Sequence, residues 1–188
     1  YPGAKDLAAE EILYADCDVL VPAALENVIT GANAGKVKAK IVAEGANGPV
    51  TSDGDAIMRA KGIVVIPDMY LNAGGVTVSY FEWLKNLSHV RFGRMEKRYE
   101  EMSAARMVKS IESATGKALS DTERKLLVHG AAEEDLVNSG LEETMSVAFQ
   151  QIREVHRRNP KVPDLRTAAF ISAIDKIAVS YMELGIFP

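Results

Sequence analysis

Three short apolar runs in the first seventy residues constrain the fold more than any other feature. They are residues 17–21 (Cys-Asp-Val-Leu-Val), 40–44 (Lys-Ile-Val-Ala-Glu) and 62–66 (Gly-Ile-Val-Val-Ile), each followed by proline or glycine. Helical stretches are predicted between them, over residues 25–35 and over residues 52–61. Apolar strands that alternate with helices are typical of right-handed parallel βαβ units whose sheet is covered on both faces. The pattern therefore predicts an α/β fold.

The second half of the chain has a different pattern. Strand signals end near residue 91 and charged residues become frequent. Ser120 and Glu123 have the spacing of a helix capping box, and Ser52 with Asp55 has the same spacing at the earlier helix. We expect a helical annex, with helices over residues 96–115, 121–128 and 141–158 and a shorter turn over residues 133–138 that is broken at Gly140.

A final helix is predicted after Asp164, which has the side chain of a good N-cap. Apolar residues recur at helical spacing from Leu165 to Tyr181, and the stretch ends at Gly185. A stripe this regular indicates core packing rather than contact with a cofactor.

Composition argues against several classes of protein. The net charge is −4 and no strong basic patch is present, which argues against a nucleic-acid partner. The apolar runs are too short to span a bilayer. The single cysteine, Cys17, excludes an internal disulfide and a cysteine-rich metal site. His89, His129 and His156 lack the spacing of metal ligands, so no metal is expected.

Residues 72–83 (Asn-Ala-Gly-Gly-Val-Thr-Val-Ser-Tyr-Phe-Glu-Trp) lie at a strand-to-helix junction. Gly74 and Gly75 allow a ligand to approach the backbone closely, and a helix start offers unpaired N–H groups. The alternative is a tight turn between two core elements.

Ligands of such sheets bind beyond the carboxyl ends of the strands. Three segments lie there, residues 22–24, 44–49 and 68–76, and all three carry small residues. Asn47 and Asn72 have side chains that donate and accept hydrogen bonds, which suits a carboxamide or a ribose. These asparagines could instead only shape turns, but three such segments at one edge favour a ligand cleft.

Common phosphate and nucleophile motifs are absent from the sequence. It contains no Gly-x-Gly-x-x-Gly loop, no Gly-x-Ser-x-Gly elbow and no Gly-Lys-Ser/Thr loop. The residues alone therefore predict a partial α/β sheet with a small-molecule edge.

Four segments resemble the glutamate dehydrogenase branch of the Glu/Leu/Phe/Val dehydrogenases. They are residues 22–24, 40–49, 67–84 and 164–169. The resemblance implies that residues 1–90 are the C-terminal portion of a Rossmann-type parallel sheet, in a dinucleotide-binding domain. It also implies a helical insertion over residues 91–140, which is either similar to a reduced antenna linked to nucleotide regulation or a helical pair that packs in the oligomer. Long closing helices are implied over residues 141–188.

The same resemblance implies that this chain is part of a homohexameric oxidoreductase, located in the cytoplasm or the mitochondrial matrix. The family deaminates L-glutamate oxidatively to 2-oxoglutarate and ammonia with NAD or NADP. Its catalytic lysine lies in a Gly-Gly-x-Lys-Gly motif that these residues lack, and the residue that selects NAD or NADP is also outside them. We therefore assign no catalytic residue here and expect the segment alone to be inactive.

Five residues match cofactor-binding positions of the family. Ala23 and Ala24 match the loop beside the adenosine and ribose. Asn47 and Asn72 match residues that line the nicotinamide, and Gly75 matches backbone near the reacting carbon.

Two residues match substrate-binding positions. Val76 matches a side chain near the reacting carbon, and Ser79 matches the residue that hydrogen-bonds the distal carboxylate of glutamate. A hydroxyl there favours glutamate over branched-chain or aromatic substrates. Two alternatives remain open: a related branched-chain or aromatic amino-acid dehydrogenase, and a non-catalytic helical interaction or regulatory module.

Overall fold

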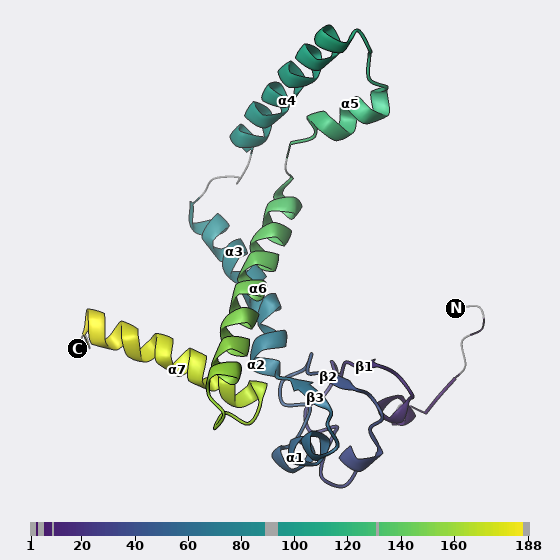
Figure 1. Ribbon diagram of the computed structural model, residues 1–188, viewed down its shortest axis with the longest axis vertical. Helices are drawn as coiled ribbons and strands as arrows, with labels where there is room; N and C mark the ends of the chain where they lie inside the picture. The colour runs from purple at the N-terminus through teal and green to yellow at the C-terminus, as the bar shows by residue number, and fades with distance from the viewer. Residues whose placement is uncertain (1–2, 4–5, 9, 89–93, 131, 186–188) are drawn as a thin grey trace. The chain divides into compact units, whose positions relative to one another are not determined.

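The computed structural model describes the chain except for residues 1–2, 4–5, 9, 89–93, 131 and 186–188, so His89 lies outside the described residues (Figure 1). The chain divides into two compact units. The first comprises Tyr1–Val76 and Thr144–Pro188, and the second comprises Thr77–Glu143.

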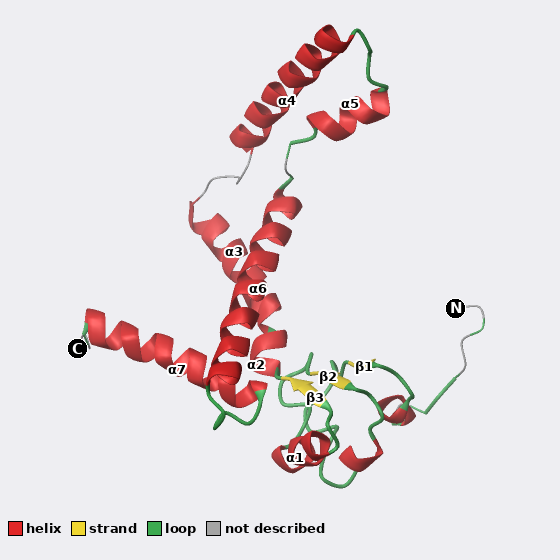
Figure 2. Ribbon diagram, viewed as in Figure 1, coloured by secondary structure: helices red, strands yellow, loops and turns green. Residues whose placement is uncertain are grey.

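A three-stranded parallel sheet lies in the first unit (Figure 2). Its strands are β1 (Val19–Leu20), β2 (Ile41–Ala43) and β3 (Val64–Ile66), in the order β1-β2-β3. Each strand falls inside one of the three apolar runs, although it is shorter than the run. The predicted parallel sheet is therefore confirmed.

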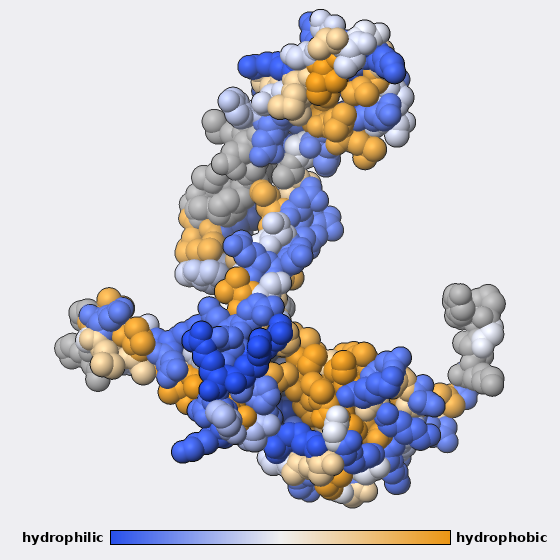
Figure 3. Space-filling view, in the orientation of Figure 1, coloured by the Kyte–Doolittle hydropathy of each residue, from blue (hydrophilic) through white to orange (hydrophobic). Residues whose placement is uncertain are grey.

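The two faces of this sheet differ in burial. Leu20, Val42 and Val65 are register partners on one face and are at most 8% exposed. They form a core with the fully buried Ile29 and Met58. On the other face, Val19 and Val64 are each 49% exposed, and Figure 3 shows hydrophobic surface over this part of the molecule. Among the described residues, the expected cover is therefore complete on one face only.

Helix α1 (Ser52–Ala60) connects β2 to β3. Its N-cap lies one residue before the predicted one, because Thr51 and not Ser52 caps the helix. Thr51 has extended backbone, and its Oγ1 accepts a hydrogen bond from the Gly54 N–H at 3.3 Å. After the helix, Gly62 turns the chain into β3 with a φ of 78°, in the left-handed region that glycine tolerates.

The helix predicted over residues 25–35 is wrong. The structure has turns there, followed by a short 3₁₀ helix, η2 (Ala34–Lys36), and η1 (Glu11–Tyr14) is a similar turn nearer the N-terminus. Asn27 has a φ of 53°, which an α-helix does not allow. Ile29 forms a parallel bridge with Val50, and Asn33 accepts from the Thr30 N–H at 2.7 Å. Tertiary pairing and asparagine side-chain bonds therefore replace the helix.

Two helices follow β3 directly. They are α2 (Asp68–Leu71) and α3 (Ala73–Ser88), with Asn72 as the C-cap of α2 between them. Gly74 and Gly75 lie inside the first turn of α3, so the glycines belong to the helix itself and not to a loop before it.

Helix α6 (Glu133–Arg158) passes through Gly140 without interruption, so the predicted break is wrong. A Cβ at Gly140 would lie 3.4 Å from the ring of Phe81 on α3, within the second unit. That distance is an ordinary van der Waals contact, so Gly140 lies where α6 packs on α3 and does not end the helix.

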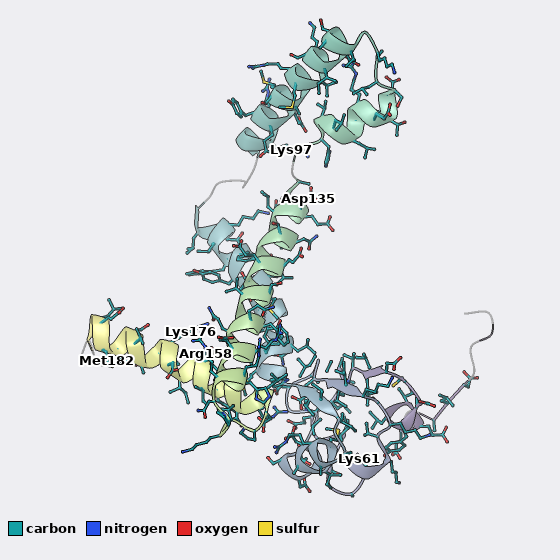
Figure 4. The ribbon with its side chains drawn as sticks, viewed as in Figure 1. Lys61, Lys97, Asp135, Arg158, Lys176 and Met182 are labelled. Atoms are coloured by element: carbon teal, nitrogen blue, oxygen red, sulfur yellow. The ribbon has the colours of Figure 1, made fainter. Side chains whose placement is uncertain are left out.

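Helix α7 (Leu165–Leu184) has the predicted boundaries. Asp164 Oδ1 accepts from the Thr167 N–H at 2.7 Å, and Gly185 ends the helix with a φ of 76°. Its first turns pack in a cluster through Ala168 and Ala169, but its apolar stripe is exposed farther along, and Met182 near the end is 86% exposed (Figure 4). The predicted core packing therefore holds for the first half of α7 only.

The second unit also contains α4 (Arg94–Thr115) and α5 (Asp121–Val128), which pack on each other. The predicted capping box is present: Ser120 Oγ accepts from the Glu123 N–H, and Glu123 Oε2 accepts from the Ser120 N–H at 2.9 Å. Arg124 on α5 donates two hydrogen bonds to the Glu112 carboxylate on α4, at 2.7 and 2.8 Å.

Candidate functional site

The loops that follow β1 and β2 lie against each other. The carbonyl of Pro22 accepts from the N–H groups of Gly45 and Ala46 at 3.1 and 2.9 Å. A Cβ at Gly45 would lie 3.0 Å from the Cβ of Ala23, so only glycine allows this approach. Ala23 and Ala24 are both exposed, and they leave the surface beside them free of bulky side chains.

The two asparagines predicted to face the ligand are in direct contact. Asn72 Nδ2 donates to Asn47 Oδ1 at 2.5 Å, although 25 residues separate them. The carboxyl ends of β2 and β3 bring them together, as the edge argument predicted. Each carboxamide has more hydrogen-bonding capacity than one shared bond uses. A polar pair of this kind can recognise a second carboxamide.

The start of α3 offers open space beside this pair. Gly75 donates its N–H to the Asn72 carbonyl at 3.3 Å, and a Cβ at Gly75 would meet nothing within 4 Å. Val76 is 73% exposed, so its apolar side chain is accessible at this edge. The structure therefore brings Asn47, Asn72, Gly75 and Val76 to one edge.

Ser79 lies farther along α3, in the second unit. It follows Val76 by three residues on this helix and is exposed. Its place relative to Asn47 and Asn72 stays a prediction, as does its contact with a substrate carboxylate.

A buried ion cluster lies beneath the asparagine pair. Glu44, at the end of β2, is fully buried. Its Oε2 accepts the Asp68 N–H at 2.8 Å, and both its oxygens lie 2.7 Å from Arg166 Nη2. Asp68 Oδ1 lies 3.1 Å from Arg166 Nη1, and Asp68 Oδ2 accepts the Gly48 N–H at 2.8 Å. The cluster joins β2, α2, α7 and the Asn47 loop.

Burial and the neighbouring charges shift the pKa values of Glu44 and Arg166 in opposite directions. Burial raises the pKa of Glu44 above its ordinary value, although the Arg166 and Asp68 hydrogen bonds partly oppose it. Burial alone lowers the pKa of Arg166, but the Glu44 hydrogen bond and the carboxylate charges raise it overall. The guanidinium is therefore permanently charged, and it compensates the buried carboxylate.

No role was expected for Glu44, Asp68 or Arg166, although all three lie in the segments that resemble the dehydrogenase family. A signal was available: a glutamate that ends a buried strand needs a cation or several donors. The sequence did not identify which of its arginines supplies the charge.

Arg59 extends the ion cluster to α1. It donates to Asp55 Oδ2 at 2.7 Å and lies 3.0 Å from Asp164 Oδ2, the cap of α7. Two arginines therefore connect the start of α7 to other elements of the first unit: Arg59 connects it to α1, and Arg166 connects it to the end of β2 and to α2.

An apolar groove of about 420 Å³ lies in the second unit, between α3 and α6. None of the seven predicted site residues is among its lining residues, which include Val78, Phe81, Leu136 and Gly140.

The residues that the structure describes contain no group of three histidine, cysteine or carboxylate side chains arranged to hold a metal ion. None of their helices is both long and apolar enough to cross a bilayer.

Comparison with known proteins gives consistent matches. Residues 1–134 match the family model described as glutamate/leucine/phenylalanine/valine dehydrogenase. The chain is 49% identical over 186 residues to the mitochondrial glutamate dehydrogenase of Dictyostelium discoideum, covering 98% of this chain and 37% of that protein. It is 39% identical to the NADP-specific glutamate dehydrogenase of Saccharolobus shibatae, covering 99% of this chain and 34% of the relative.

A third relative is the NAD-specific glutamate dehydrogenase of Clostridioides difficile, 48% identical over 60% of this chain and 26% of its own length. The chain thus spans about a third of these relatives.

Solved structures show the same fold. Glutamate dehydrogenase from Peptoniphilus asaccharolyticus superposes with a TM-score of 0.58 at 31% identity, over 89% of this chain and 32% of that one. The hetero-hexameric glutamate dehydrogenase from Thermus thermophilus superposes with a TM-score of 0.67 at 23% identity, over 99% and 35% of the two chains. The first of these neighbours supports the family as well as the fold.

Proposed function

Because this chain belongs to the glutamate/leucine/phenylalanine/valine dehydrogenase family, we propose that it forms one wall of the active-site cleft of a glutamate dehydrogenase. The full-length enzyme would oxidise L-glutamate to 2-oxoglutarate and ammonia with NAD or NADP. The observation that carries this proposal is the contact of Asn47 with Asn72 at the carboxyl edge of the parallel sheet.

The asparagine pair would hold the nicotinamide. The ring carries a carboxamide, and the side chains of Asn47 and Asn72 offer both donors and acceptors for it. The small exposed residues Ala23 and Ala24 would lie beside the adenosine and ribose. Relatives are named for NAD and for NADP, and the proposal covers either cofactor.

The chemistry would come from the cofactor, and this chain would position the reactants. When bound, the nicotinamide accepts a hydride from the α-carbon of the amino acid. The open space at Gly75 would let the ring lie close to the start of α3. Val76 would supply an apolar wall beside the reacting carbons, so that the two reacting atoms meet in a fixed geometry.

Ser79 would select the substrate. Its hydroxyl would donate a hydrogen bond to the distal carboxylate of glutamate. A substrate that ends in hydrocarbon would offer no acceptor for this hydrogen bond, so it would bind less tightly than glutamate. The opposite wall and the catalytic lysine would come from other parts of the full-length protein, and the 188-residue segment alone would be inactive.

Assembly and location follow from the relatives as proposals. We expect a homohexamer, since one structural neighbour is a hexameric assembly of such chains. Cytoplasm and mitochondrial matrix are the two expected locations, and one relative is named as mitochondrial. Light scattering of the purified full-length protein measures the first, and fractionation of cells measures the second.

The experiment that tests the function is a spectrophotometric assay of the full-length enzyme. L-glutamate is supplied with NAD in one assay and with NADP in another, and formation of the reduced cofactor is followed. We expect turnover with at least one cofactor. A folded full-length protein that binds neither cofactor would favour the non-catalytic alternative, and turnover by the 188-residue segment alone would show that the active site is misplaced.

A further inference from the structure

Glu44 is the one fully buried carboxylate among the described residues. A buried charge is costly unless it is paired and hydrogen-bonded. Here one oxygen accepts the Asp68 N–H at 2.8 Å, and both oxygens lie 2.7 Å from the same nitrogen of Arg166. The position of Glu44 is therefore fixed by Arg166 from one side and by the start of α2 from the other.

Asp68 connects Arg166 to the loop that is predicted to contact the cofactor. One of its oxygens accepts from Arg166 Nη1 at 3.1 Å, and the other accepts from the Gly48 N–H at 2.8 Å. Gly48 has a φ of 53° and directly follows Asn47. A single carboxylate thus connects the guanidinium to the loop that holds Asn47.

The same residue also sets the position of Asn72. Asp68 is the first residue of α2, and its carbonyl accepts the Asn72 N–H at 3.0 Å. Both asparagines are therefore connected to Asp68 by one hydrogen bond. Asn47 is connected through its neighbour Gly48, and Asn72 is connected through the backbone of one helical turn. Their 2.5 Å contact depends on where Asp68 is held.

Arg166 lies in an unfavourable place for its own helix. It is the second residue of α7, where the helix dipole disfavours a positive charge. Asp164 already caps this helix through the Thr167 N–H. A cation at this position therefore contributes through its contacts outside the helix and not through helix stability.

We propose that Arg166 is a positioning residue, which holds Glu44 and Asp68 so that Asn47 and Asn72 keep the geometry that binds the nicotinamide. This inference rests on the proposed function, because it assumes that the asparagine pair contacts the cofactor. Arg166 itself touches no reacting atom in this account. It acts from α7, 98 residues after Asp68 in the chain.

The competing explanation is that Arg166 only holds α7 against the sheet and α2 within the first unit. Arg59 provides the matched control for that explanation. It also attaches the start of α7, through Asp164 at 3.0 Å, and its other partner is Asp55. In the described part of the chain, Arg59 pairs with these two carboxylates and not with Glu44 or Asp68. A merely structural role would give Arg59→Met and Arg166→Met similar effects on cofactor binding.

The test measures the dissociation constant of reduced cofactor by fluorescence titration of the full-length enzyme, for wild type, Arg166→Met, Arg166→Lys and Arg59→Met. Thermal midpoints are recorded in parallel. We expect Arg166→Met to weaken cofactor binding about tenfold or more, as misplaced binding groups do. Arg59→Met should stay within about twofold even if both variants lose thermal stability. Arg166→Lys should recover part of the affinity, since one ammonium can reach one carboxylate but not span both.

A second measurement keeps the test decisive if Arg166→Met does not fold. Asn72→Ala is combined with Arg166→Lys, which retains the charge. If Arg166 acts through the asparagine pair, the double variant loses less affinity than the product of the two single losses. Independent losses that multiply, or equal losses in Arg166→Met and Arg59→Met, would overturn the inference.

The outcome for the proposed function is read separately, from turnover of L-glutamate by the wild-type enzyme. A wild type that binds reduced cofactor but does not oxidise glutamate contradicts the proposed function, while the affinity ratios among the variants still decide the role of Arg166. A wild type without cofactor affinity overturns both.

Discussion

The Nη2 atom of Arg166 lies 2.7 Å from both carboxylate oxygens of Glu44, a side chain that solvent does not reach. The two residues are 122 positions apart in the chain. Their contact ties the start of the last helix, α7, to the carboxyl end of β2. The edge of the sheet where a cofactor is expected is therefore supported by an ion pair below it.

The first prediction concerns the stability that this pair contributes. Glu44→Gln removes the charge and leaves Arg166, which is 26% exposed, with weaker compensation. Breaking a buried pair costs about 3–5 kcal/mol, and the partial exposure of Arg166 and its retained contact with Asp68 reduce this to about 2 kcal/mol. Chemical denaturation of the full-length protein measures the loss.

The control for Glu44→Gln is Asp18→Asn. Asp18 pairs with Lys40 at 2.7 Å, but both side chains are 80% exposed, so no measurable change is expected. Equal effects of the two substitutions would contradict the assigned role of the buried pair.

The second prediction concerns pH. Burial raises the pKa of Asp164, but the Thr167 hydrogen bonds and the charges of Arg59 and Arg166 outweigh it and hold the pKa below its ordinary value of 3.8. The folded protein thus binds this proton less readily than the unfolded chain. The stabilisation is present above pH 3.8 and is lost as the pH falls through the lower folded value.

Asp164→Asn tests this sign, because asparagine keeps a cap acceptor and loses the charge. At neutral pH the variant should be less stable than wild type by about 1 kcal/mol. Denaturant midpoints of the two proteins should converge as the solution is acidified below the ordinary pKa of the carboxyl. A stability difference that does not depend on pH would show that the charge of Asp164 is not its source and would contradict the prediction.

The third prediction concerns the asparagine pair. Asn72→Ala should raise the Michaelis constant for the cofactor about tenfold and change that for glutamate much less. The substitution removes the hydrogen bond from Asn72 to Asn47 and the proposed one to the nicotinamide, and both affect cofactor binding. Asn159→Ala is the control. Asn159 accepts the Lys161 N–H at 3.0 Å in an exposed turn and should leave both constants unchanged. If the two substitutions behave alike, Asn72 only shapes a turn.

The fourth prediction concerns substrate recognition. Ser79→Ala should raise the Michaelis constant for glutamate about tenfold or more and leave that for the cofactor near its original value, since a hydrogen bond to a charged group is lost. Ser180→Ala on α7 serves as the control, because Ser180 Oγ donates to the Lys176 carbonyl at 2.9 Å. An unchanged constant for glutamate in Ser79→Ala would contradict the assignment.

The sheet could be predicted from the sequence, and part of its surroundings could not. Strands β1, β2 and β3 are short apolar runs closed by proline or glycine, which are local signals. The failure at residues 25–35 has a tertiary cause. Asn27 takes a left-handed conformation and Ile29 bridges to Val50, and neither event is encoded in helical spacing.

The candidate site, like the fold, could be predicted only in part from the sequence. The parallel pattern predicted that the segments carrying Asn47 and Asn72 lie at one edge of the sheet, because parallel strands end there, but it did not predict their direct contact. The pairing of Glu44 with Arg166 needed the path of α7, which no local pattern fixes. Gly140 was taken as a helix break because glycine weakens helices, but the ring of Phe81 packs against it and the helix continues.

The measurement that tests the central claim most directly is a comparison of kcat/KM for L-glutamate, L-leucine and L-phenylalanine with the full-length enzyme. The account predicts that glutamate exceeds both others by about a hundredfold or more, because only its distal carboxylate can pair with the Ser79 hydroxyl. Equal or higher kcat/KM for leucine or phenylalanine would contradict it.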